Sequence, residues 1–416
     1  MILAKVPTWL LSAVLSQLLL ASDGLAEPWT IEVRETAGIQ RFSYPLTARF
    51  QMAKKPDAGG GFLLRDGDRQ VSAQFSLIED ATAEKPALWE VDFGLDMLPL
   101  ETRTLRLDHS KEIQSEERAG RGLKLERGQN KIRVKHPSLE FVVNEDFKGL
   151  FDAIRINGED WLEGTSRGLV VDLRDGSRRL LAVAPDSGMN RGVQVVKSGP
   201  LAVRLRFLNH EQLAGGKSLR STVQLDFPLG KSWAKIDWMV DDEGDLVERL
   251  GAELRLRLEQ NAKQPIMGDF GANGWTYAAL RPDESIVFQA GLKKVDPMES
   301  TWRVDRERDG QTAAYALPSL ANASPPVQGW AHLMDRQRCT AIAVDRFADN
   351  SQDTIRLFAS GQIALQRKFG ATLPGTTKKR FTFWLHLVNF PPQLGAATSP
   401  QSMQTPPEVS VSPSGN

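Results

Sequence analysis

The segment 381–388 reads Phe-Thr-Phe-Trp-Leu-His-Leu-Val and decides the class of fold. Apolar residues occupy every second position, and Thr382, Trp384 and His386 lie between them. Successive side chains of a β-strand point to opposite faces, so this alternation predicts a strand with one apolar face. The opposite face then carries a hydroxyl, an indole and an imidazole.

The same period of two extends outward from this segment through most of the chain. Further strands are expected at 201–208, 219–227, 233–240 and 339–344, and the pair Asn157-Gly158 favours a tight hairpin turn. No long stretch has helical periodicity. The pattern predicts an all-β fold in which a small N-terminal β-barrel is followed by a large antiparallel β-sandwich.

Turn chemistry and polar runs divide the chain into parts. The stretch after residue 108 is rich in Lys, Glu and Arg, which is typical of a boundary between domains, and the C-terminal end is rich in Ser, Pro and Gln. We therefore predict a signal peptide at 1–26, a small barrel at 27–108, a linker at 109–122, a sandwich at 123–392 and a flexible tail at 393–416.

The N-terminus has the layout of a secretory signal. Lys5 precedes a short apolar run, and Gly24 and Ala26 place small residues at the −3 and −1 positions of a cleavage site. We expect a mature chain that starts at Glu27, is secreted or periplasmic, and has no membrane span after signal removal. An uncleaved membrane anchor is the alternative.

Composition limits the partners and cofactors. The 416 residues contain 52 Lys and Arg against 52 Asp and Glu, and this balance argues against a nucleic-acid partner. The single cysteine, Cys339, excludes an internal disulfide and is expected to be buried. The acidic turn 241–245 lacks the ligand spacing of a calcium loop. We predict no metal and no cofactor.

Two strands carry the pattern Trp-x-His, namely Trp330 with His332 and Trp384 with His386. Each pattern places an indole beside an imidazole on one face of a strand. An indole offers an apolar platform to the C–H face of a sugar, and a neighbouring His can donate to hydroxyls or move a proton. The alternative is that the Trp side chains pack internally and the His side chains are satisfied there.

Cations gather on three other strands. If these strands are neighbours in one sheet, their polar faces form a surface suited to an acidic sugar, because Arg pairs well with carboxylates. Lys235 or a His is then the candidate base for β-elimination. An ordinary solvated sheet face is the alternative. The residues of this hypothesis are Trp233 and Lys235 with Arg204, Arg206, Arg255 and Arg257.

The loop 268–277 is the densest aromatic loop of the chain. It combines glycines with Asn273, Trp275 and Tyr277, and such loops frequently contact ligands. The alternative is a turn whose Trp covers the edge of the core.

The upstream unit, on residues 44–46, 62–67 and 89–93, resembles the small RIFT-barrel domain of the exo-rhamnogalacturonan lyase family. The second unit, on residues 139–143, 157–158, 329–332 and 339–344, resembles the central β-sandwich of that family, which is a galactose-mutarotase-like supersandwich. Members with the full domain set continue into a helical toroid, and we expect none here. We therefore transfer no catalytic residue from the resemblance.

These observations favour an exported protein that binds carbohydrate, and most specifically an acidic polysaccharide or its fragments. An active polysaccharide lyase or sugar epimerase is the first alternative, and a structural cell-envelope protein without a ligand is the second. The candidate catalytic residues are Lys235, His332 and His386. The candidate substrate-binding residues are Trp233, Trp275, Trp330, Trp384, Arg204, Arg206, Arg255, Arg257, Asn273 and Tyr277.

Overall fold

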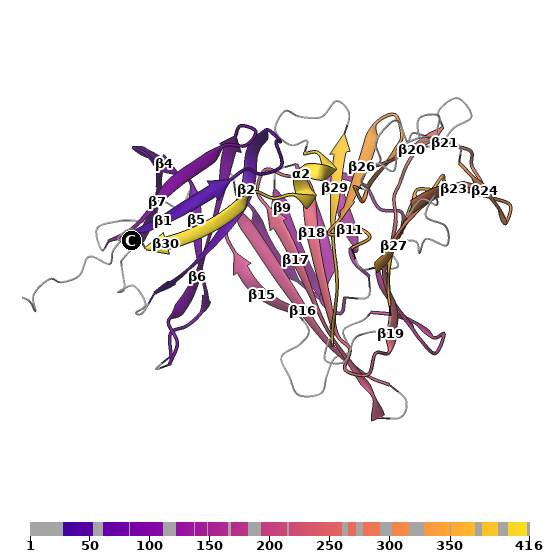
Figure 1. The fold of residues 1–416 in the computed structure, drawn as a ribbon, viewed down its shortest axis with the longest axis horizontal. Helices are drawn as coiled ribbons and strands as arrows, with labels where there is room; N and C mark the ends of the chain where they lie inside the picture. The colour runs from indigo at the N-terminus through magenta and orange to yellow at the C-terminus, as the bar shows by residue number, and fades with distance from the viewer. Residues whose placement is uncertain are drawn as a thin grey trace, which may run out of the picture.

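The computed structural model confirms the all-β class. It describes residues 28–52, 61–82, 84–110, 122–136, 138–147, 149–164, 168–181, 193–213, 216–259, 265–271, 278–291, 302–315, 328–349, 351–370, 377–389 and 398–413. Within these ranges every strand pair is antiparallel, and the one helix is α2 (Pro400–Gln404) (Figure 1). The predicted signal peptide and the loop residues Asn273, Trp275 and Tyr277 lie outside the described residues.

The small barrel lies at the left of Figure 1 and consists of two sheets around one core. The first sheet has the order β30-β1-β7-β3-β4, with bounds β1 (Trp29–Arg34), β3 (Gly61–Asp66), β4 (Arg69–Val71), β7 (Thr102–Ser110) and β30 (Glu408–Pro413). The second has the order β2-β6-β5, with bounds β2 (Arg41–Met52), β5 (Ala73–Glu79) and β6 (Ala87–Met97). The sheets adjoin along both edges, where β30 contacts β2 and β3 contacts β5.

The largest sheet of the sandwich has nine strands in the order β15-β16-β17-β18-β29-β26-β25-β20-β21. Their bounds are β15 (Val193–Ser198), β16 (Ala202–Gln212), β17 (Ser218–Pro228), β18 (Trp233–Asp241), β20 (Ile266–Phe270), β21 (Ala278–Leu280), β25 (Trp330–Met334), β26 (Arg338–Val344) and β29 (Lys378–Asn389). Cys339 on β26 is buried, as the sequence predicts.

The facing sheet has eight strands in the order β14-β13-β19-β28-β27-β22-β23-β24. Their bounds are β13 (Gly168–Leu173), β14 (Arg178–Leu180), β19 (Val247–Arg255), β22 (Glu284–Ala290), β23 (Trp302–Arg308), β24 (Gln311–Ala314), β27 (Ser351–Phe358) and β28 (Gln362–Phe369). A five-stranded sheet, β12-β11-β10-β9-β8, contributes to the same core, with bounds β8 (Lys124–Gly128), β9 (Lys131–His136), β10 (Leu139–Asn144), β11 (Ala153–Ile156) and β12 (Glu159–Asp160).

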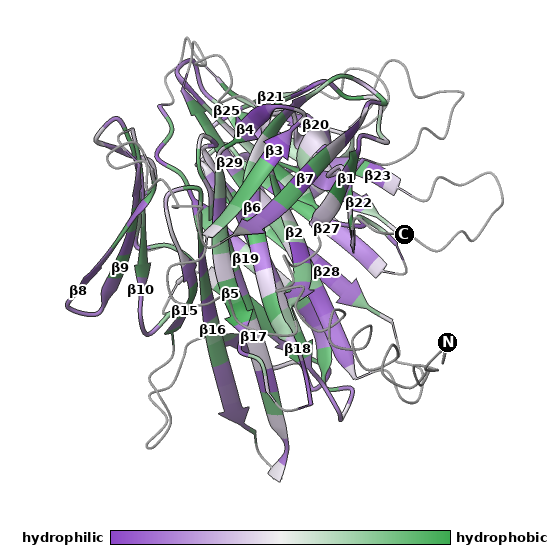
Figure 2. Cartoon of the chain, turned by 90° about the vertical axis from the view of Figure 1, so that its left-hand side faces the viewer, coloured by the Kyte–Doolittle hydropathy of each residue, from purple (hydrophilic) through white to green (hydrophobic). Residues whose placement is uncertain are grey.

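Alternation along the strands positions the site. Figure 2 shows hydrophilic and hydrophobic residues succeeding one another along strands such as β18 and β28. On β29, Phe381, Phe383, Leu385 and Leu387 join the sandwich core, as the period of two predicts. The opposite face is also covered, because Trp384 packs into the hydrophobic cluster of the barrel. The barrel therefore lies against the outer face of the nine-stranded sheet.

The prediction of a flexible tail at 393–416 is wrong for residues 398–413. They form α2 and then β30, which pairs with β1 from Trp29↔Pro413 to Arg34↔Glu408. The segment is polar in composition, but β1 offers it a free edge for backbone hydrogen bonds. The distant strand that completes the barrel cannot be seen in the local sequence.

The described part of the chain includes no helix with the length and apolar character that crossing a membrane requires.

Candidate functional site

One row of residues crosses the outer face of the nine-stranded sheet in direct register. It runs Arg204, Asp226, Lys235, Trp384, Ala343 and Trp330, from β16 to β25. A neighbouring row runs Trp233, His386, Ala341, His332 and Asp269, from β18 to β20. These two rows place seven of the predicted residues on one face of one sheet, and Arg206 lies two positions from Arg204 on the same face.

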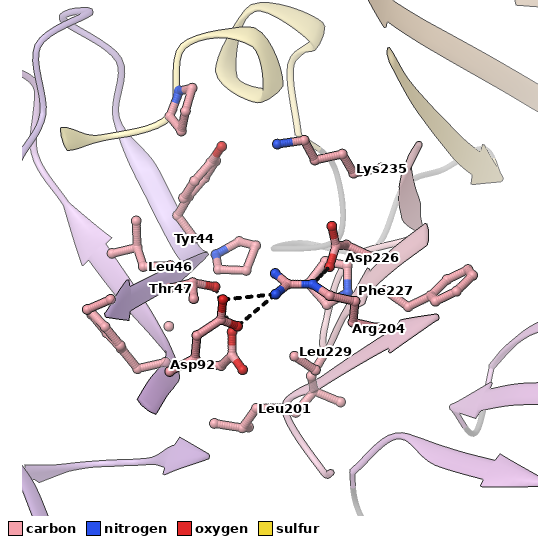
Figure 3. A pocket seen from close by; sticks show the side chains of 18 of the residues that line it. Tyr44, Leu46, Thr47, Asp92, Leu201, Arg204, Asp226, Phe227, Leu229 and Lys235 are labelled. Carbon is pink, nitrogen blue, oxygen red and sulfur yellow. Dashed lines mark hydrogen bonds and ion pairs between the residues drawn. The ribbon is translucent and has the colours of Figure 1, made fainter. Parts of the chain in front are cut away.

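A cavity of about 900 Å³ lies where the barrel covers the first of these rows. Its walls come from β2 and β6 of the barrel, from β15–β18 and β29 of the sandwich, and from the C-terminal segment. Figure 3 shows Arg204, Asp226 and Lys235 of the sandwich facing Tyr44, Thr47 and Asp92 of the barrel. A pocket of this size accommodates a small ligand such as an oligosaccharide fragment.

At one end of the cavity the charged groups are paired across the boundary between barrel and sandwich. Glu90 of β6 is fully buried and accepts two hydrogen bonds from Arg204, at 2.8 and 2.9 Å. Lys197 donates to Asp92 at 2.6 Å and to Glu90 at 3.1 Å. The Arg204 guanidinium also bonds Asp226 on the adjacent strand. We call Glu90, Asp92, Lys197, Arg204 and Asp226 the ionic cluster.

The ionic cluster keeps its acids ionised. Burial by itself raises the pKa of the Glu90 carboxyl, but the charges of Lys197 and Arg204 outweigh burial and lower this pKa to about 2. The same acids hold the pKa of Arg204 above its ordinary value, although burial acts in the opposite direction. Because the Arg204 guanidinium already bonds the carboxylates of Glu90 and Asp226, it is a poor counterion for a uronate.

The other end of the cavity is aromatic and holds one cation. The Lys235 ammonium lies 5.0 Å from the centroid of the Trp384 ring, and Trp233 lines the cavity beside them. Among the described residues, no carboxylate lies within 4.0 Å of this ammonium. In Figure 3 the Lys235 side chain extends across the cavity in the direction of Tyr44. We call Trp233, Lys235 and Trp384 the aromatic end.

The lining of the cavity carries an excess of one positive charge. Its cations are Arg49, Lys197, Arg204 and Lys235, and its anions are Glu90, Asp92 and Asp226. Arg49 bonds Glu90 at 2.9 Å, so the excess falls on Lys235.

Tyr44 closes the aromatic end on the barrel side. Its ring meets Trp233 edge-on with the centroids 5.8 Å apart, and its hydroxyl donates to the Ser402 carbonyl at 2.9 Å. Burial raises the pKa of this hydroxyl, so Tyr44 stays protonated and supplies no base.

His386 is buried and does not line the cavity. Its Nε2 accepts the Thr398 N–H at 3.2 Å, and its Nδ1 lies 3.2 Å from the Ser232 hydroxyl. Burial lowers the pKa of the imidazole to about 4, so the ring is neutral at physiological pH. The expectation that His386 faces a ligand on the outer side of β29 is therefore corrected: the C-terminal segment covers it.

Trp330 and His332 occupy the far end of the same face. Their ring centroids are 5.0 Å apart, the indole N–H donates to Gln328 at 2.8 Å, and His332 Nδ1 lies 3.5 Å from an Asp269 oxygen. Both side chains are part-exposed and neither lines the cavity. The two Trp-x-His patterns therefore share a face without sharing a pocket.

The hypothesis of one sheet face that gathers all four arginines is wrong. Arg204 and Arg206 lie on β16 of the nine-stranded sheet, whereas Arg255 ends β19 of the eight-stranded sheet. Arg255 pairs with Glu163 at 2.9 Å, and Arg257 follows the strand, where its carbonyl accepts from Arg338 at 2.6 Å. The alternation on each strand is correct, but strand neighbours are set by tertiary pairing.

Several lining residues are absent from the sequence prediction. Glu90 and Asp92 alternate with apolar residues on β6, and Lys197 lies on β15. Acids at alternate positions of a strand, in a chain that also carries alternating arginines, suggest complementary faces. Nothing in the sequence pairs one strand with the other, so this signal is weak.

In the described residues, no group of three or more His, Cys, Asp or Glu side chains is placed to hold a metal ion. The acidic turn after β18 is instead satisfied internally. Asp242 accepts the N–H groups of Leu246 and Val247 and pairs with Lys379 at 2.6 Å.

Comparison with known proteins gives likenesses of fold. No family model matches the chain, and no curated protein matches its sequence. A protein of glycosyl hydrolase family 38 from Enterococcus faecalis superposes with a TM-score of 0.53 and 10% identity, over 96% of this chain and 50% of its own. An α-mannosidase from Enterococcus faecalis V583 gives 0.49 and 12%, over 97% and 48%.

Smaller solved structures match over a smaller share of this chain. A galactose mutarotase-like protein from Lactobacillus casei ATCC 334 has a TM-score of 0.36 and 11% identity, over 62% of this chain and 99% of its own. This chain spans about half the length of the two Enterococcus faecalis chains. The superposition on the family 38 protein, at a TM-score of 0.53 and 10% identity, is a likeness of fold.

Proposed function

We propose that the protein is exported and binds an acidic carbohydrate in the cavity between barrel and sandwich. The observation that carries this proposal is the Lys235 ammonium, which lines the cavity beside two indoles with no carboxylate within 4.0 Å in the described residues. Solved proteins of similar fold include mutarotase-like and mannosidase proteins, which is consistent with a sugar ligand.

The chemistry of the lining suits a uronic-acid-containing oligosaccharide. The flat face of an indole packs against the C–H face of a pyranose, while the ionic cluster and Thr47 offer acceptors and donors to hydroxyls. A single carboxylate on the ligand would match the excess of one positive charge. A neutral sugar would leave the ammonium without a counterion.

Binding is favoured over lyase or epimerase chemistry by the state of the other groups. β-Elimination needs a cation to neutralise the uronate and a separate base for the C5 proton. In this cavity Arg204 is held by Glu90 and Asp226, and Lys235 is the cation left for the carboxylate. Neither His332 nor His386 lines the cavity, so neither of the predicted histidines can serve there as the base.

The test is calorimetric titration of the purified mature chain with a galacturonic acid trisaccharide and with the neutral galactose trisaccharide. We expect the acidic sugar to bind more tightly. Lys235→Met should weaken its affinity about tenfold, or about 1.4 kcal/mol, and should leave the neutral sugar unaffected. For this test the protein is expressed with its own N-terminus. If the chain is exported, the mass of the purified protein should be that of a chain beginning at Glu27.

Lys217→Met is the matched control, because Lys217 is exposed in the hairpin between β16 and β17 and does not line the cavity. It should bind both sugars as the parent chain does. Absence of binding by folded protein, or equal affinity of the parent and Lys235→Met chains for the acidic sugar, contradicts the proposal.

A further inference from the structure

The C-terminal segment, residues 398–413, touches both halves of the molecule. α2 lies near β26 and β25 of the sandwich, and β30 continues into the barrel (Figure 1). The segment thus passes over the boundary at which the cavity lies.

On the barrel side the segment is held by a buried arginine. Arg41 donates to the Ser402 carbonyl at 2.7 Å, to the Ser402 hydroxyl at 2.6 Å and to the Thr405 carbonyl at 2.6 Å. Its charge is balanced by Glu35 at 2.8 Å, and both side chains are fully buried. Burial raises the pKa of Glu35, but the bonds from Arg41 and from backbone N–H groups outweigh it and lower this pKa to about 2.

On the sandwich side the segment is held by a glutamine. The Gln404 amide donates to the Val344 carbonyl at 2.7 Å and to the Gly329 carbonyl at 3.1 Å. Met403 beside it is fully buried in the cluster that contains Trp233 and Trp384. The Thr398 N–H bonds His386. The segment is therefore held by directed contacts to both the barrel and the sandwich.

The segment also forms one wall of the cavity. The residues of the segment that line the cavity are Met403, Pro406, Pro407, Val409 and Val411. These side chains supply an apolar surface to the cavity. A ligand that fills the cavity would lie against them.

We propose that residues 398–413 are a strap that completes the binding cavity, so that docking of the strap and binding of the acidic carbohydrate favour each other. The coupling rests on the proposed function, whereas the docking does not. Because linkage is reciprocal, a ligand that binds only the strapped form must lower the population of the undocked form.

The test is amide hydrogen exchange of the full mature chain, read on peptides that cover 398–413. In Gln404→Ala the bonds from the Gln404 amide to the Val344 and Gly329 carbonyls are lost, and exchange in β30 should become at least several-fold faster. Gln401→Ala is the matched control, since Gln401 is exposed on the same helix and its side chain holds no partner in the described residues. The control should exchange as the parent chain does.

The galacturonic acid trisaccharide is then added at ten times its dissociation constant. Exchange of 398–413 should slow about tenfold in the parent chain, because the fraction of chains without ligand falls to about a tenth. If the sugar binds and this exchange is unchanged, the strap proposal is overturned. If no sugar binds, the proposed function fails. The docking of the strap is then tested by the exchange rates alone: faster exchange in Gln404→Ala than in Gln401→Ala supports it, and equal rates overturn it.

Discussion

The two ends of the cavity carry cations of the same sheet face in different states. Arg204 in the ionic cluster is bonded by Glu90 from the barrel and Asp226 from the adjacent strand. Lys235, two strands away in the same row, rests on the Trp384 ring with no carboxylate within 4.0 Å in the described residues. The paired charge of Arg204 links the barrel to the sandwich. The charge of Lys235 has no such partner in the described residues, and in the proposed function it binds the ligand.

This difference separates stability from binding. Removing one partner of a buried ion pair leaves the other buried without compensation, which costs far more than the pair contributes. Removing a cation that lies against an aromatic ring loses only a modest attraction. Variants at the two ends should therefore differ in which property they change.

The largest effect is expected in the ionic cluster. Glu90→Gln leaves Lys197 and Arg204 with less compensation in a buried site, and the free energy of unfolding should fall by about 3–5 kcal/mol. Urea unfolding of the purified protein measures this loss. Glu32→Gln, on the exposed side of β1, is the control and should change the free energy by no more than about 0.5 kcal/mol. Equal losses in the two variants would remove the distinction between the two ends.

Acidification should weaken the same end by a smaller and graded amount. The pKa of Glu90 is lowered from 4.5 to about 2, so its contribution to stability is complete above pH 4.5 and is lost as the pH falls towards 2. The free energy of unfolding, measured in urea at several pH values, should decline through this window. Glu35, whose pKa is also lowered to about 2, adds to the decline. In Glu90→Gln the slope should be shallower; an unchanged slope would show that Glu90 is not the titrating group.

The smallest effect on stability is expected at the aromatic end. Lys235→Met keeps an apolar side chain over Trp384 and loses only the cation–π attraction, which contributes about 1 kcal/mol or less. Urea unfolding should show a change within this limit, while the same protein loses affinity for the acidic sugar. A stability loss as large as that of Glu90→Gln would mean that Lys235 is a structural group.

Much of the site was predictable from strand alternation. The placement of Trp384 and His386 opposite Phe383 and Leu385 follows from the period of two, and so does that of Lys235 opposite Ile236. Alternation could not show which strands are neighbours. The hypothesis of one cationic surface grouped Arg255 with Arg204, although strand pairing puts them in different sheets.

Burial of the polar face of the nine-stranded sheet could not be predicted from the sequence either. A strand with one apolar face normally shows its other face to water. Here the barrel covers Trp233 and Trp384, and the C-terminal segment covers His386. A polar face that is covered by a second domain has the same sequence pattern as one that is solvated.

By itself, the sequence determined the antiparallel all-β class and the face on which each side chain lies, because both follow from local backbone geometry. Only the tertiary structure decided that Arg204 is paired with carboxylates, whereas Lys235 lies against an indole. It also decided that residues 398–413 complete the barrel and form one wall of the cavity. These outcomes depend on contacts between segments as far apart as Arg41 and Ser402, or Glu90 and Arg204. Such contacts are set by packing and charge complementarity in three dimensions, and no local pattern encodes them.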